Sequence, residues 1–111
     1  MEIINIHSGD DVDVNGTSLM GHVTTNYSDL VEAFGEPTHT SGGDKVHIEW
    51  DVEFTVVDEY RDENVIKATI YDWKLDAPEY GEYRWHIGGH SGDAAFLVQD
   101  ALEQRKVVQK S

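Results

Sequence analysis

The sequence contains no cysteine, only two prolines, and eight Lys and Arg residues against 22 acids. The lack of cysteine excludes disulfide bonds and thiolate metal sites, and it fits a reducing compartment. No run approaches the ~20 apolar residues that span a bilayer. The start, Met1 to His7, lacks the basic and apolar regions of a signal peptide. We therefore expect a protein of the cytoplasm that has no contact with membranes.

The acidic residues are unevenly placed along the chain, whose formal net charge is −14. Residues 1–44 contain eight Asp or Glu and no Lys or Arg, whereas residues 83–111 hold three acids against four basic residues. Such a field repels nucleic acids and attracts basic partners. The same acidity also serves solubility, so charge alone does not identify a partner.

The 111 residues have the usual length of one domain, and we expect residues 1–111 to fold as a single unit. Strands are predicted within residues 2–23, where Asn15-Gly16 is a two-residue hairpin signal. A helix is predicted over residues 26–34, with Asn26 as its N-cap and Gly35 after its last turn. A C-terminal helix over residues 92–105 follows from an apolar stripe at helical spacing, made of Ala94, Leu97, Val98, Ala101 and Leu102.

Between the two helices, residues 46–87 predict a three-strand meander. Residues 46–56 alternate apolar and polar side chains without a break, which is typical of a half-buried strand. Further strands are predicted over residues 65–75 and 83–87, with a turn over residues 76–81. The fold class is therefore α+β, an antiparallel sheet (meander plus N-terminal hairpin) with two α-helices packed on one face. The predicted buried face consists of Trp50, Val52, Phe54, Ile66, Ala68, Ile70, Trp85 and Ile87.

The other sheet face is expected to meet water or a partner. Matching the buried residues places Glu53 opposite Lys67, Asp51 opposite Thr69, Glu49 opposite Tyr71 and His47 opposite Trp73. The same argument places Tyr71 beside His86 and Trp73 beside Arg84. This face is a predicted protein-binding surface, because exposed Trp and Tyr beside Arg are typical of binding hot spots; its residues are Glu49, Asp51, Glu53, Tyr71, Trp73 and Arg84. The alternative is a stacked Trp73–Arg84 pair that only stabilises the sheet.

A second predicted site is the glycine-rich segment that joins the last strand to the C-terminal helix. Backbone N–H groups at a helix start favour anions, so the predicted ligand-binding residues are Arg84, His86, Gly88, Gly89, His90 and Ser91. A tight connection into a capped helix explains the glycines equally well, and no Walker lysine is present. His86, His90 and Asp93 do not share one helix face, so no metal site and no cofactor is predicted. No catalytic motif is recognisable, and we expect a protein that is not an enzyme.

Four segments together resemble a family of small, mostly uncharacterised proteins of tailed bacteriophages. They are Gly16-Thr-Ser-Leu-Met-Gly21, Tyr27-Ser-Asp-Leu-Val-Glu-Ala-Phe-Gly-Glu-Pro37, Ile70-Tyr-Asp-Trp-Lys74 and Trp85-His-Ile-Gly-Gly-His90. The resemblance covers about residues 16–102. It implies an accessory protein that acts in the cytoplasm of an infected host, and by analogy an inhibitor of host defence.

Two binding functions stay open at this point. In the first, the acidic surface binds a basic host protein, in the manner of a DNA mimic. In the second, the segment Gly88–Asp93 binds an anionic small molecule such as a nucleotide signal. Neither function includes direct binding of nucleic acid, and self-association is compatible with both.

Overall fold

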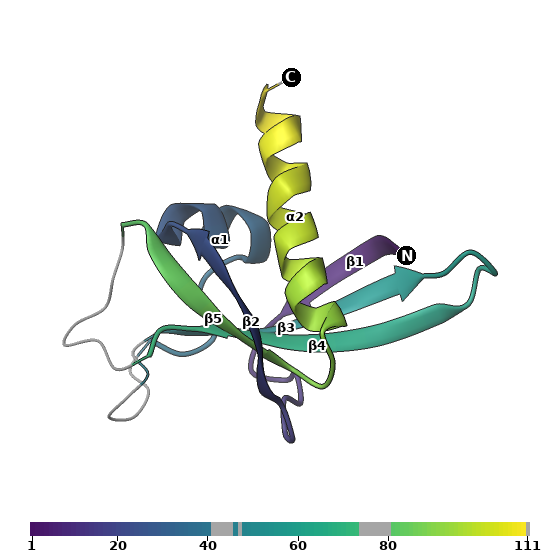
Figure 1. Cartoon of the computed structure of the whole chain (residues 1–111), viewed down its shortest axis with the longest axis horizontal. Helices are drawn as coiled ribbons and strands as arrows, with labels where there is room; N and C mark the ends of the chain where they lie inside the picture. Colours follow the sequence, from purple (N-terminus) through teal and green to yellow (C-terminus); the bar gives the residue numbers. More distant parts are fainter. Residues whose placement is uncertain (41–45, 47, 74–80, 111) are drawn as a thin grey trace.

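The computed structural model describes residues 1–40, 46, 48–73 and 81–110, with side chains described up to Gln104. Within these residues the element order is β1 (Glu2–Ser8), β2 (Ser18–Thr25), α1 (Tyr27–Phe34), β3 (Glu49–Val57), β4 (Glu63–Tyr71), β5 (Tyr83–Gly89) and α2 (Asp93–Lys110). The strands form one antiparallel sheet, and both helices lie on the same face of it (Figure 1). The predicted α+β class, with two helices on one face of an antiparallel sheet, is confirmed.

The strand order is β1-β3-β4-β5-β2, so the two N-terminal strands lie at opposite edges of the sheet. The predicted N-terminal hairpin is therefore wrong, although its turn exists. The Thr17 N–H donates to the Val14 carbonyl at 3.3 Å across Asn15-Gly16. A turn signal sets the local backbone but not the strand partners. β1 pairs with β3 and β2 with β5, where Ile6 and Val23 pack against the core.

The register of the meander agrees with the predicted one. Trp50 lies opposite Ile70 and Phe54 opposite Ile66, so the intervening polar residues share the other face. The pairing of Ile70 with Ile87 extends this register to β5. A one-residue slip would turn every apolar side chain out of the core, so the unbroken alternation of β3 specifies the register strongly.

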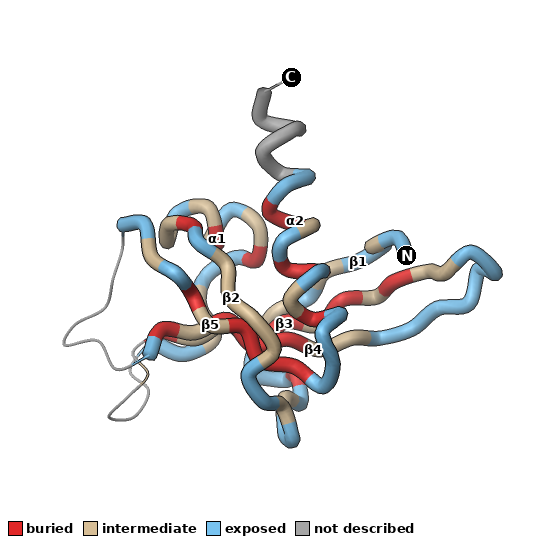
Figure 2. The backbone as a smooth tube through the Cα atoms, viewed as in Figure 1, coloured by how far each residue is buried: buried red, intermediate tan, exposed pale blue. Residues whose placement is uncertain are grey.

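The core lies between the apolar face of the sheet and the two helices. Figure 2 colours the buried residues red. The buried face matches the prediction, except that Ile66 is only partly buried. The Trp50 and Trp85 rings meet edge to face, with centroids 5.5 Å apart. Their indole N–H groups donate to the carbonyls of Gly35 at 2.8 Å and Thr25 at 3.0 Å. Both large rings are thus buried without an unsatisfied donor.

Side-chain oxygens accept backbone N–H groups at the start of both helices. Asn26 Oδ1 accepts the Asp29 N–H at 2.8 Å, and Gly35, with φ of 86°, follows the last turn of α1 as predicted. At α2, Ser91 Oγ accepts the Asp93 N–H at 3.3 Å. The predicted apolar stripe of α2 is buried, but the helix continues to Lys110, past its predicted end at residue 105.

β4 begins and ends earlier than predicted, at Glu63 and Tyr71 instead of residues 65 and 75. The buried Asp72 marks its end: its Oδ1 accepts the Ile48 N–H at 3.1 Å in place of a backbone carbonyl, while its own N–H still donates to the Ile48 carbonyl at 3.3 Å. An Asp side chain that takes over a backbone hydrogen bond ends a regular ladder. The same interaction precedes β3, which begins at Glu49 instead of residue 46. Of the predicted turn over residues 76–81, residues 76–80 lie outside the described residues.

The face opposite the helices is less open than predicted. Because β1 and β2 lie at opposite edges, their connection, residues 9–17, passes across this face (Figure 1). The Gly9 N–H donates to the Asp51 carbonyl at 3.1 Å, and Val12 is buried. In the middle of the face, Asp51 and Thr69 are buried as well. Solvent therefore hardly reaches Asp51 and Thr69, whereas Trp73, just beyond the end of β4, is 39% exposed.

Candidate functional site

The three acids of β3 lie on the same face, as the alternation predicts, but their surroundings differ. Glu49 and Glu53 are partly buried, whereas Asp51 keeps only 4% of its surface exposed. Glu53 lies at the register position between His7 of β1 and Lys67 of β4. The predicted acidic edge is thus two partly accessible carboxylates around a buried one.

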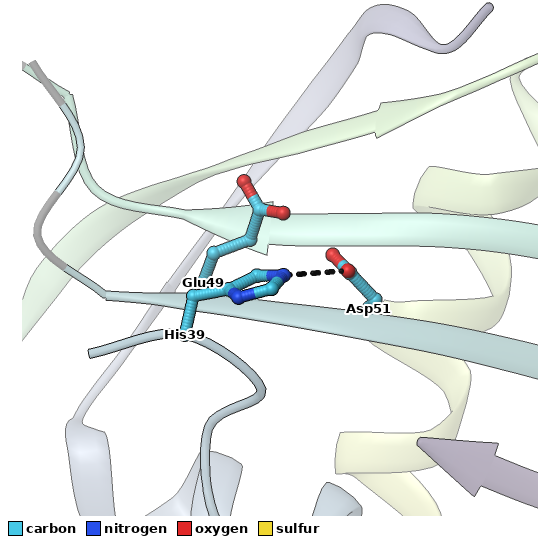
Figure 3. Close-up of side chains that lie close together, drawn as sticks. All are labelled: His39, Glu49 and Asp51. Carbon is cyan, nitrogen blue, oxygen red and sulfur yellow. Dashed lines mark hydrogen bonds and ion pairs between the residues drawn. The ribbon is translucent and has the colours of Figure 1, made fainter. Parts of the chain in front are cut away.

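The segment that follows α1 brings a histidine to this acidic row. His39 and Glu49 form an antiparallel bridge through two backbone hydrogen bonds of 3.0 and 2.9 Å. Thr38 Oγ1 accepts the Asp51 N–H at 3.0 Å, which ties the segment to β3 a second time. As a result, His39 Nε2 lies 3.1 Å from Asp51 Oδ2, and the three side chains converge as shown in Figure 3.

The proximity of the two carboxyl groups changes the acidity of Glu49. Burial raises the pKa of Glu49 to about 8, and both the proton that it can share with Asp51 and the negative charge of Asp51 act in the same direction. Burial also raises the pKa of Tyr71, with a contribution from the charge of Glu49. Around neutral pH, Glu49 therefore favours its protonated form unless a cation is close to it.

Asp51 carries the second unusual feature of this cluster. Its Oδ1 is buried without a hydrogen-bond partner among the described residues. The ligand atoms of His39, Glu49 and Asp51 all lie within 4.8 Å of one another. The three groups are thus arranged so that they can hold a cation. The alternation of β3 could have placed Glu49 and Asp51 together, but nothing in the sequence shows that His39 runs beside them.

Next to this cluster lies a pocket of about 280 Å³. On one side it is lined by Glu49, Tyr71 and Trp73. On the other side it is lined by Val14 and Thr17 of the connection between β1 and β2, and by Ser18 of β2. Trp73 is 39% exposed at this end of the face. A carboxyl group and two aromatic rings in one pocket are suited to a cationic or aromatic group.

An aromatic group extends from the pocket across β4 and β5. The Tyr71 and His86 rings stack with centroids 5.4 Å apart, and Trp73 lies 6.3 Å from Tyr71. His22 of β2 meets His86 from the other side at 4.7 Å. Burial, followed by the charges of His22 and Arg84, lowers the pKa of His86. The structure thus brings Tyr71 and Trp73 of the predicted binding surface together with His86, which was predicted to lie beside Tyr71.

The predicted cross-strand position of Trp73 beside Arg84 is not part of the β4–β5 ladder. This ladder ends at the pair Tyr71 and His86, and Trp73 lies beyond the end of β4. The Trp73 N–H donates to Tyr83 Oη at 3.3 Å. Arg84 lies opposite Thr24 of β2 and is exposed. His47, which was predicted opposite Trp73, lies outside the described residues.

The glycines of the predicted ligand loop lie inside β5, where they allow close packing. A Cβ at Gly88 would overlap Thr69 Oγ1, and one at Gly89 would overlap Ala94. Ser91 already caps α2, while His90 is exposed beyond the strand and His86 lies on the sheet face. The packing of Gly88 and Gly89 accounts for both glycines, and anion binding by this segment stays a prediction.

No protein-family model, no curated protein and no solved structure matches this chain. In the described part of the chain, no helix combines the length and the apolar character needed to cross a membrane. The resemblance to phage proteins therefore rests on its four sequence segments alone.

Proposed function

We propose that the protein acts without catalysis, by binding a partner protein that presents a basic surface. The observation that carries this proposal is the exposed Trp73 at a pocket that also contains Tyr71 and Glu49. Trp and Tyr supply much of the energy of protein interfaces, because they bury a large area at a small cost in conformational entropy. Trp73 and Tyr71 together are the proposed aromatic anchor of the interface.

The net charge of −14 supports a basic partner. Complementary fields accelerate association and exclude acidic competitors, even where few charges touch directly. Since Asp51 is buried, the accessible acids of this face are Glu49 and Glu53. Glu49 lines the pocket of the aromatic anchor, where a Lys or Arg of the partner would meet it and favour its charged form. Glu53 lies further along β3, opposite Lys67.

The resemblance to phage proteins supports a more specific form of this proposal. A phage accessory protein that occupies a basic surface of a host defence protein in the host cytoplasm would act as an inhibitor, in the manner of a DNA mimic. Its acidic field takes the place of the nucleic acid that such a surface normally binds. This more specific proposal names the class of the partner, which is a host defence protein.

The test is affinity capture from a bacterial lysate, followed by measurement of the dissociation constant with the purified captured protein. We expect Trp73→Ala to weaken binding at least about 30-fold, which corresponds to the ~2 kcal/mol of a hot spot. Phe96→Ala is the matched control, because Phe96 is an aromatic side chain that is 55% exposed on α2. Equal binding by Trp73→Ala and the wild type would contradict the proposal.

A further inference from the structure

Asp51 occupies a position that is costly for an unpaired carboxylate. It keeps 4% of its surface exposed, and its Oδ1 has no hydrogen-bond partner among the described residues. Buried polar atoms in proteins are almost always paired with protein atoms, water or an ion. His39 satisfies the other oxygen of Asp51 at 3.1 Å, so Oδ1 is left either to a proton that it shares with Glu49 or to a cation at this place.

The neighbouring side chains complete a set of metal ligands. The ligand atoms of His39, Glu49 and Asp51 lie within 4.8 Å of one another. Donor atoms around a tetrahedral zinc ion are about 3.4 Å apart, given metal–ligand bonds of roughly 2.1 Å. The His39–Asp51 pair already has this spacing. The Glu49 carboxyl lies within 4.8 Å of both groups, so small rotations about side-chain bonds would bring all three to this spacing.

The backbone holds this set in place from two sides. Glu49 and Asp51 are alternate residues of β3, so their side chains leave the same face of the strand. His39 is tied to Glu49 by two backbone hydrogen bonds, and the adjacent Thr38 accepts the Asp51 N–H. A ligand set that is fixed on a sheet loses little conformational entropy when it binds an ion.

We propose that His39, Glu49 and Asp51 hold a first-row divalent transition cation such as Zn²⁺. One imidazole and two carboxylates are suitable ligands for such ions, whereas Mg²⁺ and Ca²⁺ favour sites made of oxygen alone. A dication offsets the repulsion between the two carboxylates and satisfies the free oxygen of Asp51. Three protein ligands would leave a fourth position of a tetrahedral ion open to water or to a group of a partner.

The test is calorimetric titration of Zn²⁺ into the full chain after treatment with a chelator, with Co²⁺ absorption as a second readout of the ligand geometry. We expect one strong site per chain. His39→Ala should weaken it at least about 100-fold, since even the loss of an outer-shell partner costs 10–100-fold. His39 is exposed, so this variant should fold, and the near-ultraviolet circular dichroism of Trp50 and Trp85 checks that it does.

His7→Ala is the matched control, because His7 forms a similar pair with Asp11 at 2.9 Å on the surface, with the side chains 46% and 70% exposed. This variant should bind Zn²⁺ as the wild type does. Unchanged affinity in His39→Ala would overturn the proposal, and so would unchanged affinity in a folded Asp51→Asn variant. Equal affinity for Mg²⁺ or Ca²⁺ would overturn the assignment to a transition metal.

This inference shares Glu49 with the proposed function, but the two are tested by different experiments. The titration uses the isolated protein, whereas partner capture is tested by Trp73. Failure of one result therefore leaves the other standing.

Discussion

Nε2 of the exposed His39 lies 3.1 Å from Oδ2 of the buried Asp51, although the two residues are 12 positions apart. In metal-free buffer, His39→Ala removes the hydrogen-bond partner of Asp51 Oδ2, which is buried. We expect the free energy of unfolding to fall by about 1–3 kcal/mol, the usual cost of an unsatisfied buried acceptor. Urea denaturation measures this change. His7→Ala removes an exposed pair and should change stability by less than about 0.5 kcal/mol; equal losses in both variants would refute this role of His39.

The raised pKa of Glu49 predicts an unusual pH dependence of stability. The folded-state pKa of about 8 lies above the ordinary glutamate value of 4.5, so the contribution of Glu49 is fully present below pH 4.5 and is lost as the pH rises through 8. In metal-free buffer, the difference in unfolding free energy between wild type and Glu49→Gln should therefore decrease between these two pH values. Using the difference removes the opposite slope from His86, whose lowered pKa makes stability rise with pH. A difference that does not change with pH would show that Glu49 titrates normally.

The core prediction concerns Phe54, which is fully buried between the sheet and α1, where its ring meets Phe34 edge to face. We expect Phe54→Ala to reduce the unfolding free energy by about 3–5 kcal/mol, because it removes a large apolar surface and leaves a cavity. Phe96→Ala deletes the same group from the exposed side of α2 and should change stability by no more than about 0.5 kcal/mol. Chemical denaturation of the two variants makes the comparison direct.

The glycines of β5 offer a test between packing and ligand binding. Gly88→Ala places a methyl group against Thr69 Oγ1, and such overpacking typically costs about 1–3 kcal/mol. Replacing Thr69 by Ala in the same chain removes this oxygen and should restore part of the stability. Gly92 has open space around it, so Gly92→Ala is the control that should leave stability nearly unchanged. If Gly88→Ala is as stable as the wild type, close packing does not explain this glycine.

Whether a sequence-based prediction is correct depends on how many residues its pattern covers. The alternation from Trp50 to Phe54 extends over a whole strand, and it predicted both the buried face and the register of the meander. The signal at Asn15-Gly16 extends over a single turn; it predicted the turn but could not show that β1 and β2 pair with strands far away in the sequence. Asn26 and Gly35 act within one helix, so both helix ends were predicted well.

Only part of the candidate site could be predicted from the sequence. Glu49 and Asp51 were placed on one face by the period of β3, but their burial depends on the connection across that face and on residues 38–39. The position of His39 results from backbone hydrogen bonds to β3, and no local pattern in the sequence encodes it. The early end of β4 has a similar origin, since Asp72 accepts a hydrogen bond from a residue 24 positions away.

The last prediction concerns the way in which the acidic field acts on a partner. If a basic surface is the target, the association rate constant should fall steeply as salt rises, because the Debye length shortens from about 10 Å at 0.1 M to about 3 Å at 1 M. Glu53→Lys and Glu103→Lys change the net charge equally, but Glu53 lies on the sheet face whereas Glu103 lies on α2. Stopped-flow mixing with the captured partner should therefore show slower association for Glu53→Lys, and a smaller effect for Glu103→Lys. The dissociation rate should change little in both variants, since charges at the rim of an interface act mainly on encounter. Equal effects of the two charge reversals would show that only the net charge of the molecule matters and not the position of Glu53. An association rate constant that does not change with salt would exclude electrostatic attraction as the basis of recognition.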